Sequence, residues 1–493
     1  EQMRTQGKVI ASFAERKAAI QAALNEQAGR LNATVAADEA LLDEVTALVE
    51  WPVVLEAGFE AHFLQVPQEC LILTMQQNQK YFPLLDADGK LMNRFLLVSN
   101  LQAADPSHII HGNERVLRAR LSDAEFFYKQ DQKATLESRL PKLENVVYHN
   151  KIGNQAERIS RLTSIAGSIA KALGADVAVA ERAARLAKAD LVTEMVGEFP
   201  ELQGTMGKYY ARLDGESEEI AAAIEQHYQP RFAGDALPEG KIATAVSLAD
   251  KLETLVGIWG IGLVPTGDKD PYALRRAALG VLRMLMQYDL NAADLIQTAF
   301  GSFPAGVLNP KTPAEVADFM QARLAVLLQN DYPQDVVAAV LAKAPQRLGD
   351  IEGRLNAVAA FKALPEAAAL AAANKRVHNL LKKADAELGA VNEALLQQSE
   401  EKALFAAAQA LAPKIEAALA KQDFQTALTE LAAIKPQVDT FFDGVMVMSD
   451  DAAVKQNRLN LLNQLAQQMN AVADIALLGE YAKAPECACL RRC

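Results

Sequence analysis

Helical periodicity from about residue 113 almost to the end most constrains the fold of this 493-residue chain. Apolar side chains recur at helical spacing in segments of roughly 10–25 residues, and glycine or proline separates one segment from the next. At about 100–200 residues per domain, the length predicts three or four domains. We therefore expect a mainly α multidomain protein.

The first 110 residues have a different pattern. Apolar stripes predict helices within residues 1–50, and short apolar runs at residues 53–55, 63–66 and 71–73 predict strands. Residues 86–89, Asp-Ala-Asp-Gly, predict a hairpin turn between two further strands. This pattern predicts an α/β or α+β module, with Cys70 as a core residue.

The formal charge is −12, from 50 basic and 62 acidic residues. This balance argues against coating of nucleic acid or an anionic membrane by the whole surface, but it leaves room for a local basic site. The sequence contains no uninterrupted run of about 18 apolar residues that would predict a membrane span. We expect neither a DNA partner nor a membrane partner.

Four cysteines are too few for the disulfide framework of a large secreted protein, so a reducing cytoplasm is expected. Three of them, Cys487, Cys489 and Cys493, lie in the last seven residues. We interpret residues 479–493 as a disordered tail or an expression scar. Because the first residue is Glu1 rather than Met, we also expect the chain to be the C-terminal part of a longer protein.

No motif for nucleotide chemistry stands out. The nearest glycine-rich loop, residues 234–241, has one residue too many between its glycines and Ile242 where Ser or Thr would hold Mg²⁺. Six scattered histidines show no local spacing typical of a metal site. The sequence predicts no catalytic residues and no cofactor or metal in this chain.

One long-range pattern concerns metal chemistry. His149, Asp190, His227 and Asp250 occur in an order that resembles the HD phosphohydrolase superfamily, whose helices place His and Asp ligands around divalent ions. In that family a histidine precedes the central aspartate, but here the residue is Ala189. We expect an HD-like helical fold with a degenerate site, and keep a working metal phosphohydrolase as the alternative.

Positive charge gathers between residues 375 and 383, where no acidic residue occurs. Helical spacing puts Lys375, Asn379 and Lys382 on one face, with an apolar stripe between residues 377 and 388 on the other. Cations suit phosphates, and amide or imidazole groups suit bases. The alternative is the solvated face of a helix packed on an aromatic core. The candidate RNA contacts are Lys375, Arg376, His378, Asn379, Lys382, Lys383, Asn457 and Arg458.

Four long stretches resemble the β subunit of bacterial heterotetrameric glycyl-tRNA synthetase. They are residues 50–52 with 73–82, residues 112–124, residues 188–204 and residues 270–276. The resemblance extends from the first residues to about Leu478, and it implies that an N-terminal region of the family is absent.

The resemblance implies a division of labour. In this family an α subunit binds ATP, Mg and glycine, and the β subunit binds tRNA(Gly) within an α2β2 assembly, so this chain would position tRNA for glycylation. It also implies a helical anticodon-binding domain of the DALR type, whose motifs match residues 375–379, 441–448 and 457–458. The alternatives are the metal phosphohydrolase and a non-catalytic helical scaffold.

The same resemblance implies the domain organisation. We expect a remnant of a B3/B4-like α/β module at residues 1–148, an HD-like helical domain at 149–266, a helical linker or body at 267–373 and the anticodon-binding bundle at 374–478.

Overall fold

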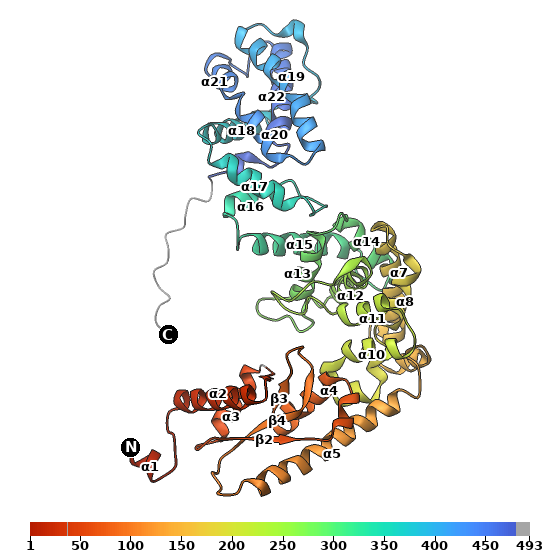
Figure 1. The fold of residues 1–493 in the computed structure, drawn as a ribbon. Coiled ribbons are helices and arrows are strands. Elements are labelled where there is room, and N and C mark those ends of the chain that lie inside the picture. Colours follow the sequence, from red (N-terminus) through yellow and green to blue (C-terminus); the bar gives the residue numbers. More distant parts are fainter. Residues whose placement is uncertain (37, 480–493) are drawn as a thin grey trace. The chain divides into compact units, whose positions relative to one another are not determined.

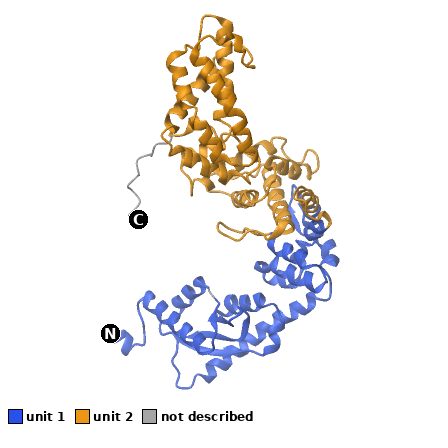
Figure 2. Cartoon of the chain, turned by 45° about the horizontal axis from the view of Figure 1, so that its top comes forward, with its two compact units in different colours: residues 1–160, 179–227 blue, residues 161–178, 228–493 orange. Residues whose placement is uncertain are grey.

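A computed structural model describes residues 1–36 and 38–479 (Figure 1). The chain divides into two compact units, the first formed by residues 1–160 with 179–227, the second by residues 161–178 with residue 228 onward (Figure 2). Beyond Gly479 the predicted tail, with Cys487, Cys489 and Cys493, lies outside the described residues. The finer domain boundaries given above stay predictions.

The N-terminal module of the first unit is a small antiparallel sheet covered by helices. Its strands are β1 (Thr34–Val35), β2 (Val53–Gly58), β3 (Phe82–Leu85) and β4 (Leu91–Ser99), in the spatial order β1-β3-β4-β2 (Figure 1). Antiparallel pairing selects α+β from the two expected alternatives. The sheet and the helices α2 (Phe13–Arg30) and α3 (Glu39–Leu48) share a core that includes Ile20, Leu24, Leu42, Phe82 and Leu96.

The predicted hairpin turn is confirmed between β3 and β4. Gly89 has a φ of 74°, a conformation that glycine adopts without steric cost. The Asp86 amide donates to the Lys90 carbonyl at 2.8 Å and closes the turn.

Two of the predicted strands are wrong. Residues 71–73 belong to the helix α4 (Gln68–Leu73), which continues into a π-helical turn η2 (Thr74–Asn78), and residues 63–65 belong to the 3₁₀ helix η1 (Ala61–Gln65). A short apolar run suits a buried strand and a buried helix equally, so periodicity cannot separate them. Cys70 is buried as expected, and burial raises the pKa of its thiol.

The rest of the first unit consists of α5 (Ser107–Asp131) and short helices. At the end of α5 the buried Asp131 carboxylate accepts the amide protons of Glu194 and Met195, at 2.8 and 3.0 Å, and so caps α9 (Glu194–Glu198). The other elements are α1 (Gln2–Thr5), α6 (Leu136–Arg139), η3 (Leu140–Asn145), β5 (Val147–His149), β6 (Gly153–Asn154), α8 (Val177–Leu186), η4 (Ala189–Val192), η5 (Pro200–Leu202), α10 (Thr205–Leu213) and α11 (Glu218–Gln226).

The second unit is entirely helical in its described residues. Its elements after α7 (Gln155–Ala172), which begins in the first unit, are α12 (Gly240–Gly260), α13 (Leu274–Leu285), α14 (Ala292–Gly301), α15 (Thr312–Leu328), α16 (Gln334–Leu341), α17 (Ile351–Lys362), α18 (Ala367–Leu381), η6 (Glu393–Leu395), α19 (Ser399–Ala420), α20 (Phe424–Ala432), α21 (Lys435–Gly444), α22 (Ala452–Met469) and η7 (Ile475–Leu477). The mainly α multidomain fold predicted from the sequence is confirmed.

The helix α13 begins at Leu274, after Ala273 in the left-handed region (φ 54°). The Asp270 carboxylate caps it, because it accepts the amide protons of Leu274 and Arg275 at 2.8 and 2.9 Å. Further along the unit, a break at residues 363–366 separates α17 from α18, which meet at 108°.

Among the described residues, α19 is long and apolar enough by composition to cross a membrane, and α17 with α18 would pass the same test as a bent pair. Inside the bundle α19 packs on α20, α21 and α22. It also buries a carboxylate, Glu401. Core helices of bundles satisfy the same criterion, so this finding is weak evidence for a membrane.

Replacing Gly207 by alanine is expected to weaken the contact between α10 and α11 by about 1–3 kcal/mol. The added Cβ would lie 2.6 Å from Ile224 Cγ2 and 3.1 Å from Asp190 Oδ2. Hydrogen exchange of the amides in both helices measures the change. As a control, Gly29→Ala in α2 adds a Cβ with nothing within 4 Å and should be neutral or stabilising. Unchanged protection in the Gly207 variant would contradict this packing.

Candidate nucleic-acid interface

The predicted basic strip lies on α18 and the turn that follows it. Leu370, Asn374 and Val377 are buried against the bundle, which leaves Lys375 and Arg376 exposed on the opposite side. Asn379, Lys382 and Lys383 are exposed as well, whereas His378 is half-buried. The amphipathic pattern is confirmed as far as Leu381, where the helix ends. The apolar residues after it, Ala384 and Leu388, belong to the following loop.

Arg376 stacks on an aromatic ring from another helix. Its guanidinium carbon lies 4.6 Å from the ring centroid of Phe442 on α21. Phe442 in turn packs edge-on against Phe441, which is fully buried. A guanidinium held flat on a ring combines a positive charge with a planar surface, and nucleobases stack on such surfaces. The resemblance placed both segments in one domain, but the sequence did not indicate that Arg376 stacks on Phe442.

The electrostatic surroundings of the strip favour an anion. The first acidic side chain after it, Asp385, is paired with Lys455 at 2.7 Å, and this contact lowers the pKa of Asp385. Lys382 and Lys383 lie directly after the C-terminal end of α18 and also stabilise the helix dipole. Part of the positive charge therefore has a structural role, while its exposure keeps it available to phosphates.

His378 contacts Asn470, the residue directly after α22. Its Nε2 lies 3.1 Å from the Asn470 side-chain nitrogen, and Asn470 also donates to Asn374 at 3.2 Å. The ring is half-buried and one nitrogen already has a partner. The structure thus assigns His378 a packing contact at the edge of the strip, and its contact with RNA stays a prediction.

Two candidate RNA contacts, Asn457 and Arg458, are not accessible in this structure. Arg458 is 5% exposed, and its Nε donates at 2.6 Å to Oε1 of Glu401, which is completely buried. Asn457 is 2% exposed and exchanges two hydrogen bonds with the backbone of Asn392, at 2.7 and 3.0 Å. Their polar groups resemble those of a binding surface, but they form hydrogen bonds with Asn392 and Glu401 inside the bundle. These two residues hold the bundle together.

Two of the four HD positions, Asp190 and His227, are fully buried next to backbone groups of the first unit. Asp190 is fully buried, and its Oδ2 accepts the amide protons of Gly204 and Gly207, at 2.6 and 2.9 Å, at the beginning of α10. His227 is also fully buried, with Nδ1 2.5 Å from the Ile224 carbonyl oxygen. Across residues 1–36 and 38–479, no group of three or more His, Cys, Asp or Glu side chains is placed to hold an ion.

The other two HD positions lie in different surroundings. His149 ends β5, where its Nδ1 accepts the Lys151 amide proton at 3.2 Å, and Asp250 is on α12 of the second unit. The geometry therefore gives no support to the phosphohydrolase alternative.

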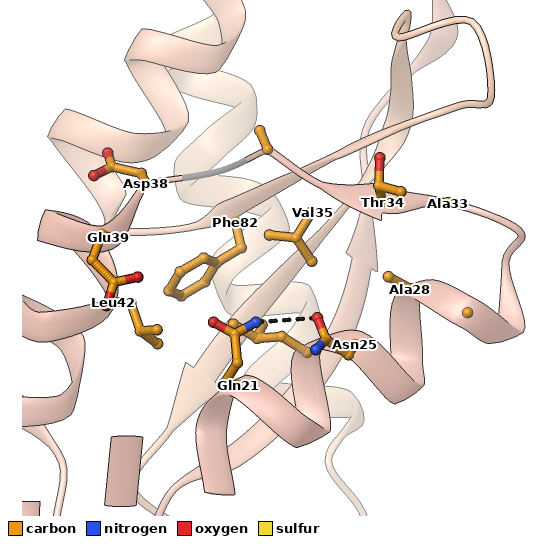
Figure 3. Close-up of a pocket in the computed structure, with 13 residues that line it drawn as sticks. Gln21, Asn25, Ala28, Ala33, Thr34, Val35, Asp38, Glu39, Leu42 and Phe82 are labelled. Atoms are coloured by element: carbon orange, nitrogen blue, oxygen red, sulfur yellow. Dashed lines mark hydrogen bonds between the residues drawn. The ribbon is translucent and has the colours of Figure 1, made fainter. Parts of the chain in front are cut away.

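A cavity of about 450 Å³ lies between α2, β1 and α3 in the first unit (Figure 3). Gln21 donates to Asn25 at 3.1 Å on its wall, while Leu42 and Phe82 form an apolar surface. Its charged lining residues are acidic, and Asp38 already caps α3 through the Leu41 amide. Acidic groups repel phosphates, so this cavity does not resemble a nucleotide site.

Replacing Arg458 by methionine is expected to destabilise the C-terminal bundle by about 3–5 kcal/mol, because the Glu401 carboxylate would stay buried without its cation. Hydrogen exchange of α19 and α22 measures the loss. A second variant, Arg458→Met with Glu401→Gln, should recover part of it. The exposed Lys383→Met is the control and should change stability by less than about 0.5 kcal/mol. If Arg458→Met left the bundle intact but abolished RNA binding, the packing role would be wrong.

Asp190 makes stability depend on pH. Burial raises its pKa to about 6, against the opposing effect of the Gly204 and Gly207 amides. Because the folded pKa exceeds that of the unfolded chain, this group stabilises the fold at low pH and loses that contribution as pH rises from about 4 through 6.

Relative to Asp190→Asn, the natural protein should lose roughly 3 kcal/mol of local stability between pH 4 and pH 7. The asparagine oxygen can accept the same two amide protons but does not ionise. Hydrogen exchange of α10 at several pH values tests this. Parallel pH curves for the two proteins would refute it.

Two family models match this chain. The family model described as glycyl-tRNA synthetase beta subunit matches residues 1–342, and the model described as DALR anticodon binding domain matches residues 370–479. The second match contains the basic strip and the buried Glu401–Arg458 pair.

Curated relatives carry the same description. The glycine–tRNA ligase beta subunits of Neisseria meningitidis serogroup B (strain MC58) and Neisseria gonorrhoeae (strain FA 1090) are each 85% identical over 97% of this chain and 70% of their own length. That of Ralstonia nicotianae is 58% identical over 97% of this chain and 68% of its length. The chain therefore belongs to the glycyl-tRNA synthetase β subunit family.

Proposed function

We propose that this chain is the tRNA-binding β subunit of a glycine–tRNA ligase and that its C-terminal bundle contacts the anticodon region of tRNA(Gly). The observation that carries the proposal is the exposed strip of Lys375, Arg376, Lys382 and Lys383 within the segment matched by the anticodon-binding model. Family membership supports the ligase role of the subunit.

The strip can contact RNA in three physical ways. Its exposed cations attract phosphates, and this contribution weakens as salt increases. Arg376 on Phe442 offers a planar cation on which an unstacked base of a loop can lie. Asn379, exposed between the cations, can donate to and accept from a base edge. Single-stranded loops present such bases, which favours an anticodon loop as the ligand.

The chemistry of glycylation is assigned to a partner. We propose that a catalytic α subunit binds ATP, Mg and glycine, and that the two kinds of chain form an α2β2 assembly in the cytoplasm. The main contribution of this chain is then to position the tRNA. Holding the bound tRNA so that its 3′ end reaches the active site of the α subunit lowers the entropic cost of the reaction.

The scaffold alternative makes a different prediction, since a purely structural helical protein would not bind tRNA. Measuring tRNA(Gly) binding with and without the α subunit separates the two functions.

Reversing three charges, with Lys375, Arg376 and Lys382 all changed to Glu, is expected to weaken tRNA(Gly) binding by about 100-fold or more at low salt and to flatten its dependence on salt. Fluorescence anisotropy over a range of KCl concentrations measures both effects. Glycine activation by the α subunit, followed by ATP–pyrophosphate exchange, should not change.

A matched control reverses three other exposed lysines of the same unit, Lys311, Lys343 and Lys402. It has the same net charge but keeps the strip, and it should bind tRNA(Gly) within a few-fold of the natural chain. Equal affinities of the strip variant and the natural chain would refute the anticodon assignment.

A further inference from the structure

The long helix α5 has one side that no other element of the first unit covers. Its buried residues, Leu117, Leu121, Ala124 and Asp131, face the module, where α5 contacts β2, α4 and α9. The opposite side is exposed over about five turns. Its exposed residues are His108, His111, Gly112, Arg115, Val116, Ala119, Arg120, Ser122, Asp123 and Phe126, and we call this surface the α5 ridge.

Charge on the α5 ridge is unbalanced. Of the nearby acidic side chains, Glu60 is bound to Arg118 and Glu125 to Lys129 and His62. By contrast, Arg115 and Arg120 form no hydrogen bond or ion pair with any residue of the described ranges 1–36 and 38–479. The ridge also carries one exposed carboxylate, Asp123, so its two arginines leave a local excess of positive charge in a chain whose net charge is −12.

The placement of the two arginines fits a double-stranded polyanion. They are five positions apart in the sequence, so they lie about 7.5 Å apart along the helix axis and about 140° apart around it. Val116, Ala119 and Asp123 are exposed on the arc between them. The two arginine side chains thus leave the helix in different directions. An A-form RNA helix presents a wide, shallow minor groove with a phosphate strand on each side.

The geometry points to a second RNA site: we propose that the α5 ridge docks on a double-helical arm of the same tRNA, with Arg115 and Arg120 each contacting the phosphates of one strand. This inference rests on the proposed tRNA-binding function. Arginine matches phosphate oxygens with two parallel hydrogen bonds, and the imidazoles of His108 and His111, one to two turns before Arg115, can bond ribose hydroxyls.

A protein partner fits this surface less well. The cores of protein interfaces are depleted of charged residues, whereas here Arg115 lies near the middle of the exposed arc. The exposed apolar side chains of the ridge, Val116 (48% exposed) and Phe126 (57% exposed), are ten residues apart and do not form a continuous patch. Charge complementarity therefore favours RNA.

The test uses the full chain with Arg115→Ala and Arg120→Ala combined, and three RNA probes: tRNA(Gly), a hairpin of its acceptor arm, and its anticodon stem-loop. We expect binding of tRNA(Gly) and of the acceptor hairpin to weaken by about 10- to 100-fold, with the slope of log K against log salt reduced by about one to two. Binding of the anticodon stem-loop should not change.

The matched control removes two other cations from the same region, with Lys129→Ala and Lys133→Ala combined. Lys129 is already compensated by Glu125, and Lys133 bonds only the side chain of Gln130 among the described residues. This control should bind all three probes within about two-fold of the natural chain. The variant Arg115→Lys with Arg120→Lys should restore most of the affinity, which distinguishes lost charge from lost folding.

Unchanged binding of tRNA(Gly) and of the acceptor hairpin would overturn the α5 site and leave the anticodon proposal intact. Loss of α-subunit assembly with unchanged RNA binding would also overturn it, and would assign the ridge to a protein partner. If the natural chain, with and without the α subunit, bound none of the three probes, the proposed function itself would fail.

Discussion

Buried carboxylates that accept backbone amide protons are the interaction on which the arrangement of short helices depends. Every helix leaves unsatisfied N–H groups in its first turn, and a chain of many short helices has many such groups near or inside its core. The buried Asp131 and Asp190 satisfy the first turns of α9 and α10, and the half-buried Asp270 does the same for α13. Each bond of this charge-assisted kind contributes about 1.5–3 kcal/mol. Asp131 caps α9 from 63 residues away in the sequence.

The HD position Asp190 shows this use of a carboxylate clearly. Its Oδ2 accepts two amide protons, from the loop before α10 and from the helix itself, while its Oδ1 is buried with no hydrogen-bond partner among the described residues. Its raised pKa further disfavours the ionised form that a divalent ion needs. The same aspartate that would serve catalysis in a metal enzyme here orders the backbone.

Sequence reasoning succeeded where the information was local. The helical run at 375–381 and the turn at Gly89 depend on neighbouring residues and could be predicted. It failed where the deciding contact is distant in the sequence. The residues around Arg458 do not reveal its partner Glu401. The apolar run at residues 71–73 does not reveal whether it forms a strand or, as in the structure, a helix. The exposure of lysine and arginine side chains could not be predicted for the same reason, because such a side chain can be buried in an ion pair or exposed on the surface.

The distribution of exposed cations gives physical meaning to the acidic net charge. Because most of the surface repels phosphate, an RNA gains affinity only where cations are exposed, and nonspecific binding at other orientations is suppressed. The two proposed contacts, one for a loop and one for a duplex, would act on the same RNA, and the second would then bind at a high effective concentration. An RNA that carries only the loop or only the duplex would bind through one contact and would not gain this additional affinity. Discrimination between tRNA and other RNA can then arise from the pairing of two weak sites rather than from the strength of either.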